Sequence, residues 1–127
     1  MFKVNVKEEF EAAHRIPGYP GKCDRLHGHS WTVEACVSGK ELDALGMLVD
    51  FKSVKKELKA VLDEMDHRYL NELPPFSEGI QPTAENMAKH IYEKLAQSGM
   101  FRDGIRLESV CVWESPRSCV VYEPEEE

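Results

Sequence analysis

Hydrophobic and polar residues alternate along the first part of the chain, and this period of two predicts two strands. Every second residue from Phe2 to Val6 is apolar, and the extended pattern continues through residues 10–14. Two prolines and two glycines within residues 15–26 predict a loop. The alternation resumes over residues 27–37, where odd-numbered side chains share one face of the second strand.

Apolar residues then recur every three or four positions, which predicts two helices. Asp50 is a suitable N-cap for the first helix. Its expected buried stripe is Phe51, Val54, Leu58, Val61, Leu62 and Met65. After a loop at residues 74–79, Thr83 caps the second helix and Gly99 lies just past its end. The expected buried face of this second helix is Met87, Ile91 and Leu95.

Two segments rich in β-branched residues, 105–113 and 119–122, predict the last strands, with a turn at Ser115 and Pro116. The element order is therefore strand, strand, helix, helix, strand, strand (ββααββ). This order suggests an α+β fold in which an antiparallel four-stranded sheet carries two helices on one face. Because such a sheet leaves its second face and its edges uncovered, we expect a homo-oligomer.

The composition is that of one globular domain spanning residues 1–127. Hydrophobic residues make up 42% and charged residues 31%, a balance typical of folded chains. The formal net charge of −7 argues against general nucleic-acid binding, although local basic groups would still allow an anionic small-molecule substrate. No apolar run has the length of a signal peptide or membrane span, so we expect a cytoplasmic protein with no membrane partner.

The four cysteines fall into two groups. Without a secretion signal we expect all of them to be reduced, and no CxxC pair suggests a zinc ribbon. Cys36, Cys111 and Cys119 lie in predicted strands, where we expect buried apolar side chains. Cys23 instead lies in the predicted loop, four residues before His27.

The sharpest chemical signal is the run His27-Gly28-His29. Two residues apart on a strand, both imidazoles project from one face, and this geometry suits two ligands of one zinc ion. His14, at the end of the neighbouring predicted strand, is the natural third ligand. Three neutral imidazoles leave a fourth tetrahedral position for water or substrate, as catalytic zinc sites require. The alternative is an ordinary exposed strand on which the histidine pair binds nothing.

Cys23 permits two interpretations. As a fourth ligand it would close a structural site of one cysteine and three histidines. As a proton-transfer residue it would need a cation or base nearby to form its thiolate near neutral pH, and Lys22 and Arg25 are candidates. Spacing in the sequence does not decide between the two.

Two other polar positions suit catalysis or binding. Asp66 directly precedes His67, and an aspartate can hold a histidine in one tautomer for proton transfer near pH 7. The alternative is an exposed charge pair at a helix C-terminus. Glu114 ends a strand and could recognise an adjacent ring NH and amino group, or could simply be a solvated strand end. His90 is expected on the surface of the second helix.

Six short segments occur in a distinctive order. They are FEAAHR (10–15), CDRLHGHS (23–30), VDF (49–51), LDEMDHRYLN (62–71), PTAEN (82–86) and VCVWES (110–115). Together they resemble the 6-pyruvoyl-tetrahydropterin synthase superfamily and, within it, the bacterial branch that makes 6-carboxytetrahydropterin for queuosine biosynthesis. Three residues separate Cys23 from the HGH motif, as in the carboxy branch, whereas this spacer is longer in the animal-type pyruvoyl enzyme. The family variant with glutamate in place of the cysteine is excluded by Cys23.

The resemblance implies a tunnelling fold, in which trimers close a twelve-stranded barrel and stack as hexamers, with the pocket at a subunit interface. The implied ligands of Zn²⁺ are His14, His27 and His29. The implied proton-transfer residues are Cys23, Asp66 and His67. The implied substrate-binding residues are Glu114, which would anchor the pterin ring, and Thr83 and Glu85.

The implied reaction is a zinc-dependent carbon–carbon lyase step. It converts 7,8-dihydroneopterin triphosphate to 6-carboxytetrahydropterin, acetaldehyde and triphosphate. Zinc on the side-chain oxygens of the substrate would acidify a neighbouring C–H, so that a base of ordinary strength can remove the proton. Arg15, Lys22 and Arg25 are expected to contact the triphosphate. The alternatives are a 6-pyruvoyl-tetrahydropterin synthase acting on the same substrate, and a non-catalytic oligomer whose zinc site only joins subunits.

Overall fold

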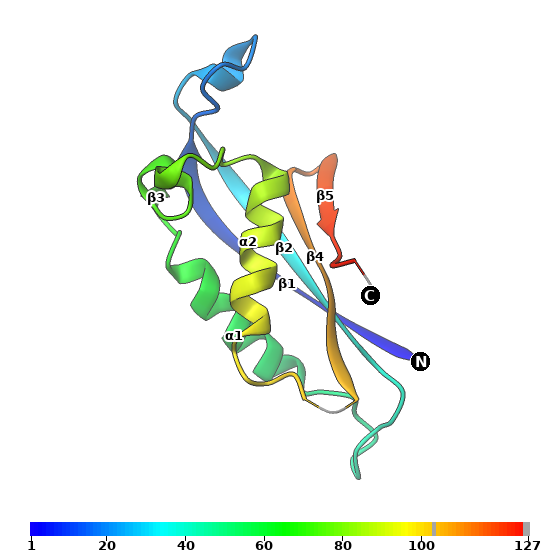
Figure 1. The fold of residues 1–127 in the computed structure, drawn as a ribbon. Helices are drawn as coiled ribbons and strands as arrows, with labels where there is room; N and C mark the ends of the chain where they lie inside the picture. Colours follow the sequence, from blue (N-terminus) through cyan, green and yellow to red (C-terminus); the bar gives the residue numbers. More distant parts are fainter. Residues whose placement is uncertain (103, 126–127) are drawn as a thin grey trace.

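The structure is a computed structural model that describes residues 1–102 and 104–125, with only the backbone of Cys23. A curved β-sheet wraps around two helices (Figure 1). Its long strands are β1 (Phe2–His14), β2 (His27–Gly39), β4 (Ile105–Ser115) and β5 (Ser118–Tyr122). The helices are α1 (Phe51–Asp63) and α2 (Ala84–Ala96). Three short 3₁₀ turns cover Lys22–Asp24, Leu70–Glu72 and Phe76–Glu78.

The sheet contains one strand that the sequence pattern did not predict. Its order is β3-β1-β2-β4-β5, and the four long strands are antiparallel as expected. The fifth strand, β3 (Arg68–Tyr69), pairs in parallel with Ala12 and Ala13 of β1, so the sheet is mixed. The side chain of Asn71 extends this pairing, because its amide donates to the Arg15 carbonyl (2.8 Å) and accepts from the Arg15 N–H (2.9 Å). Two residues are too few to show a period of two, so β3 is defined by its partner alone.

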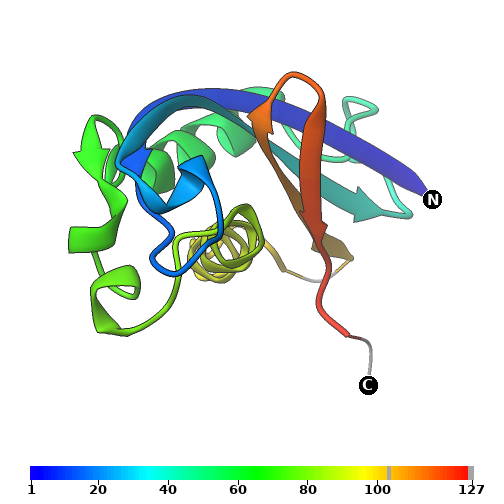
Figure 2. The ribbon, with the colours of Figure 1, turned by 90° about the horizontal axis from the view of Figure 1, so that it is seen from above.

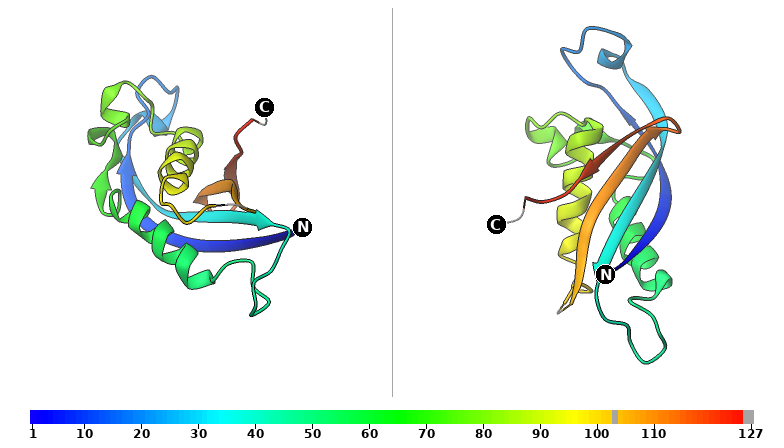
Figure 3. Two further views of the ribbon diagram at one scale, coloured as in Figure 1. Left: turned by 60° about the horizontal axis from the view of Figure 1, so that its bottom comes forward. Right: turned by 90° about the vertical axis from the view of Figure 1, so that its right-hand side faces the viewer.

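Both helices pack on the same face of the sheet, as the element order predicted (Figures 2 and 3). Helix α1 covers β1, and α2 covers β4 and β5. The largest fully buried side chains between these layers are Trp31, Leu58, Leu62, Leu70, Met87, Ile91 and Leu95. Each large apolar side chain that is fully buried contributes roughly 1.5–3 kcal/mol, so this single core stabilises the sheet's curvature around the helices.

The helix caps are those expected from the sequence. The Asp50 carboxylate accepts from the Lys52 N–H (2.8 Å), and the Thr83 hydroxyl accepts from the Asn86 N–H (3.2 Å). The buried face of α1 begins at Val54, later than predicted. Phe51 is 59% exposed although the helical period places it on the same face. Periodicity identifies the face of a helix but not the point at which the covering elements end.

Two expectations about individual side chains were wrong. Cys111 is buried, but Cys36 is only half-buried and Cys119 is exposed, because these cysteines lie outside the row of side chains that faces the helices. His90 is not a free surface residue: it is half-buried and its ring packs edge-on against Phe76, with centroids 5.6 Å apart. Within the part of the chain that the structure describes, no helix is long and apolar enough to cross a membrane.

Candidate metal centre

Antiparallel pairing of β1 with β2 brings three histidines together. His14 lies opposite His27, and Ala12 lies opposite His29. Because side chains alternate along each strand, all three rings stand on the same face, in line with the buried Trp31. The ring centroids of the three histidine pairs are 4.4, 5.2 and 4.7 Å apart. The structure thus brings together the three residues that the sequence singled out as metal ligands.

Backbone carbonyls hold two of these rings in one tautomer. Nδ1 of His14 lies 2.7 Å from the carbonyl oxygen of Pro82, and Nδ1 of His27 lies 2.7 Å from that of Arg25. A carbonyl can only accept, so each Nδ1 carries the proton and donates it. The lone pair is then on Nε2, which is the arrangement that second partners impose on metal-binding histidines.

The Nε2 atoms show that the site suits a metal ion. Those of His14, His27 and His29 are buried, and none has a hydrogen-bond partner among the described residues. An unpaired buried polar atom normally costs about 1–3 kcal/mol, so three of them facing one another require an explanation. One ligand atom from each histidine and one carboxylate oxygen of Glu114 all lie within 4.8 Å of one another. Imidazole and carboxylate are ligands of divalent metal ions, so the donor set fits such an ion.

Burial adjusts the protonation of the cluster in the direction that metal binding requires. It lowers the pKa of His14, with proximity to the other histidines acting in the same direction. It also lowers the pKa of His29, although the Glu114 carboxylate opposes this change. A lower pKa keeps the imidazole neutral at neutral pH, and only the neutral ring offers its lone pair to a metal.

Trp31 forms the floor of the cluster. It is fully buried, its indole N–H donates to the Ala12 carbonyl (3.2 Å), and it stacks on Phe10. Its ring contacts His14 and His29 edge-on, with centroid distances of 5.0 and 5.1 Å. The ligand rings are therefore held by packing as well as by hydrogen bonds.

Glu114 lies at the histidine cluster itself. Its Oε1 is 3.1 Å from Nε2 of His29, and both side chains line a cavity of about 330 Å³ together with Glu85. Thr83 was expected in the same pocket, but its hydroxyl caps α2 by accepting from the Asn86 N–H. The cavity beside the histidine cluster therefore contains two of the three residues expected to bind substrate.

Sequence reasoning assigned Glu114 to the substrate and missed its proximity to the three histidines. Part of the signal was present, because Val110 and Val112 precede it on the same inward-facing row of β4. The missing information was the register between β2 and β4, in which Thr32 pairs with Trp113. Because Glu114 directly follows Trp113 and faces inward, that register places its side chain beside His29.

The loop that carries Cys23 is tied together by an ion pair. Cys23 lies in the 3₁₀ turn Lys22–Asp24, but its side chain is outside the described residues, so its predicted role has no geometry to support it. Arg15 binds Asp24 through its guanidinium, with Nη2 3.1 Å from Oδ1. The same carboxylate accepts from the Gly18 N–H (3.2 Å). Arg15, expected to contact a triphosphate, is therefore engaged within the loop.

The Asp66–His67 pair is anchored to the outer edge of β1. Oδ1 of Asp66 accepts from the Glu11 N–H (2.9 Å) and lies 3.0 Å from Nδ1 of His67. The Glu11 N–H is the main reason why the pKa of Asp66 is lowered, and the contact with His67 adds to it. His67 has a left-handed backbone (φ 59°), and its side chain is 76% exposed.

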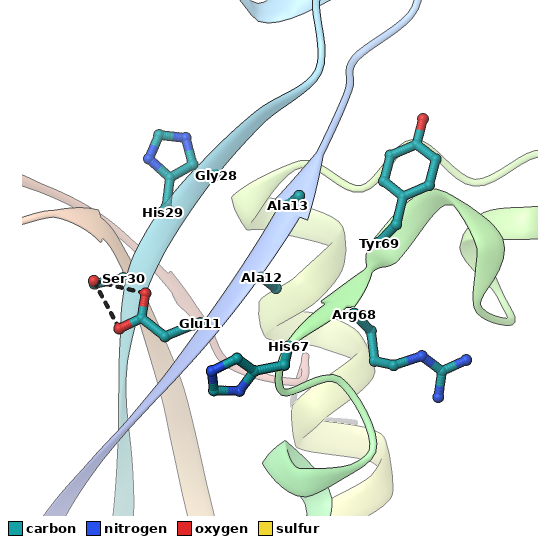
Figure 4. Close-up of a pocket in the computed structure, with 9 residues that line it drawn as sticks. All are labelled: Glu11, Ala12, Ala13, Gly28, His29, Ser30, His67, Arg68 and Tyr69. Carbon is teal, nitrogen blue, oxygen red and sulfur yellow. Dashed lines mark hydrogen bonds between the residues drawn. The ribbon is translucent and has the colours of Figure 1, made fainter.

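Within one chain this pair does not reach the histidine cluster. In Figure 4 the ring of His67 lies beside β1, whereas the ring of His29 lies beyond β2, and the two rings do not point toward each other. His67 lines a cavity of about 510 Å³ that is also lined by His29, Glu11 and Ser30. The hydroxyl of Ser30 donates to both Glu11 oxygens at 2.8 Å. Within one chain the Asp66–His67 pair thus lies outside the histidine cluster, although His67 and His29 border one cavity.

Comparison with known proteins relates the chain to one family. The family model of 6-pyruvoyl tetrahydropterin synthase matches residues 3–125. The chain is 37% identical over 131 residues to the 6-carboxy-5,6,7,8-tetrahydropterin synthase of Bacillus subtilis (strain 168), covering 97% of this chain and 86% of that protein. It is 30% identical over 144 residues to the Haemophilus influenzae protein of the same name, covering 97% and 99%.

The fold is similar to that of a solved structure as well. The 6-pyruvoyl tetrahydropterin synthase of Caenorhabditis elegans matches with a TM-score of 0.85 and 29% sequence identity, covering 98% of this chain and 96% of that one. The tunnelling fold expected from the sequence is therefore confirmed. The chain is accordingly an enzyme of the 6-pyruvoyl tetrahydropterin synthase family.

Proposed function

We propose that the protein is a zinc-dependent 6-carboxy-5,6,7,8-tetrahydropterin synthase of queuosine biosynthesis. It converts 7,8-dihydroneopterin triphosphate to 6-carboxytetrahydropterin, acetaldehyde and triphosphate. The observation that carries the proposal is the cluster of three buried Nε2 atoms, without hydrogen-bond partners among the described residues, beside a cavity lined by two carboxylates. Relatives of that name, at 30% and 37% identity over nearly the whole chain, support the same reaction.

The three histidines provide the metal site of this proposal. His14, His27 and His29 hold the ion through Nε2, with two of the rings oriented by the carbonyls that bind Nδ1. Bound zinc supplies a Lewis acid that lowers the energy of negative charge on substrate oxygens. Glu114 and Glu85 line the adjoining cavity, where a carboxylate can accept two hydrogen bonds from the ring NH and amino group of a pterin.

Proton transfer is assigned to Cys23 and to the Asp66–His67 pair. Asp66 binds Nδ1 of His67, which leaves Nε2 of the exposed ring free to take or give a proton. A positioned acid or base of this kind typically contributes about 10²–10⁴ in rate. Cys23 precedes the ligand His27 by four residues and is the proposed partner base or acid on the metal side.

The separation of these groups supports an active site shared between subunits. Among the described residues β1 pairs with another strand on its outer side only at Ala12 and Ala13, and Asp66 and His67 bind the backbone of Glu11, so the part of this edge before Glu11 is available to a second copy. His67 lies at that edge. We therefore propose a homo-oligomer, a trimer that stacks as a hexamer, in which one chain supplies the metal cluster and its neighbour supplies Asp66 and His67.

Incubation of the zinc-loaded protein with 7,8-dihydroneopterin triphosphate tests the assignment directly. Acetaldehyde, triphosphate and 6-carboxytetrahydropterin should appear in equal amounts. Release of triphosphate without acetaldehyde would identify a 6-pyruvoyl-tetrahydropterin synthase instead. Release of neither product, from a protein that binds zinc, would favour the non-catalytic oligomer.

A further inference from the structure

Glu114 is too close to the histidine nitrogens to be only a substrate-binding residue. Its Oε1 lies 3.1 Å from Nε2 of His29, and a carboxylate oxygen lies within 4.8 Å of a nitrogen of each of the three histidines. Two ligands of one tetrahedral zinc ion are about 3.3 Å apart, because each bond is about 2.0–2.1 Å. Nε2 of His29 has no hydrogen-bond partner among the described residues, and its contact with Oε1 of Glu114 is an ion pair only if the ring is protonated.

The backbone that carries Glu114 lies at an irregular end of β4. The pairing of β4 with β2 ends at Trp113 and Thr32, so β4 has no ladder with β2 at Glu114. On its other side, the pairing of β4 with β5 shifts register between Trp113 and Ser115. Such irregularities redirect side chains at the ends of strands. Glu114 therefore lies at a bulge, where β4 is flanked by β5 and is no longer paired with β2.

Glu114 is also accessible from the cavity. Its side chain is 31% exposed and that of His29 is 25% exposed, and both line the cavity of about 330 Å³. A ring that enters this cavity would meet the carboxylate that contacts the cluster. One carboxylate cannot serve a metal ion and two ring donors equally well at the same time.

We propose that Glu114 is a displaceable fourth ligand. In the substrate-free enzyme its carboxylate binds the metal beside the three histidines, and it turns to the ring when a pterin occupies the cavity. The fourth position that the three histidines leave free is then open only when substrate is present. The part concerning the pterin rests on the proposed function, whereas the part concerning the metal rests on the cluster alone.

Two charge-matched variants separate this role from a general electrostatic effect. Glu114→Gln removes the carboxylate at the cluster, and Glu85→Gln removes a carboxylate from the same cavity but outside the cluster. The affinity for Zn²⁺ is measured on each purified oligomer by competition with a chromophoric chelator. The coordination is followed by the visible absorption of the Co²⁺-loaded proteins. Circular dichroism of the metal-free proteins verifies that both variants fold.

We expect Glu114→Gln to lose about 100-fold in Zn²⁺ affinity, since even partners outside the ligand set commonly contribute 10–100-fold. Its Co²⁺ spectrum should change in band position and intensity, while Glu85→Gln should match the wild type in both measurements. Equal affinities and identical spectra for the two variants would overturn the inference and leave the three-histidine site intact. A wild-type protein that binds neither ion would overturn the proposed function as well.

Discussion

An active site shared between two chains can be tested by combining two inactive variants. His29→Ala removes a metal ligand, and His67→Ala removes the exposed ring at the β1 edge. Because 76% of the His67 side chain is exposed, this second change should alter the free energy of unfolding by no more than about 0.5 kcal/mol. Its effect on activity is then chemical, and we expect a loss of about 10²–10⁴ in kcat.

In a mixed oligomer some sites regain both halves. A site is complete when its metal half comes from the His67→Ala chain and its His67 comes from the His29→Ala chain. With random assembly at a ratio of one to one, about a quarter of the interfaces meet this condition. Co-expressed variants should therefore reach about a quarter of wild-type activity, measured as acetaldehyde released per chain, although each variant alone is nearly inactive.

The matched control combines two variants that damage the same half. His27→Ala and His29→Ala both remove a ligand of one cluster within one chain, so their mixture should stay inactive. If the His29→Ala and His67→Ala mixture is no more active than this control, each chain contains its whole active site and the shared-site proposal is refuted. Size-exclusion chromatography of the mixtures shows whether all variants still assemble.

Three further predictions concern single positions. Asp66→Asn should lower the melting temperature at pH 7, because the pKa of Asp66 is lowered in the folded protein and its carboxylate therefore stabilises the fold. This stabilisation is present above the ordinary pKa of 3.8, and the difference in melting temperature between variant and wild type should vanish as the pH falls through the lowered pKa of the folded protein. Gly39→Ala should lower the free energy of unfolding by about 1–3 kcal/mol, since a Cβ would lie 2.5 Å from the Gly104 carbonyl oxygen and from Leu48; Gly28→Ala, where the nearest atom is 3.9 Å away, is the control in the same urea titration. Thr83→Ala should cost about 1 kcal/mol of stability through its lost cap while KM stays unchanged, and a large rise in KM would instead indicate direct substrate contact.

Local sequence patterns were sufficient wherever a side chain's position depends on its own strand or helix. Period-two alternation predicted that His27 and His29 share a face. The extended pattern over residues 10–14 likewise predicted that His14 lies at the end of the first strand. The caps Asp50 and Thr83 were predictable because each acts on a backbone N–H only two or three residues ahead. These features need no information about which elements pair.

The remaining features depend on register between distant segments. Glu114 contacts His29 only because Trp113 pairs with Thr32, and no pattern within either strand contains that offset. Likewise β3 exists only because Arg68 pairs with Ala12, more than fifty residues earlier in the chain. Sequence reasoning could therefore group the three histidines but could not place Glu114 or the Asp66–His67 pair relative to them.

The histidine cluster and the Asp66–His67 pair lie at different places on the sheet. The metal cluster uses β1, β2 and β4 of one chain, so a single folded chain contains every proposed ligand. The Asp66–His67 pair is bound to the Glu11 N–H at the edge of β1, where the ring of His67 does not point toward that of His29. In the proposed function, metal binding therefore needs only one folded chain, whereas proton transfer to the substrate needs that edge to meet another chain. Under this proposal assembly is a condition of catalysis, because the histidine cluster and the Asp66–His67 pair of one chain act in different active sites.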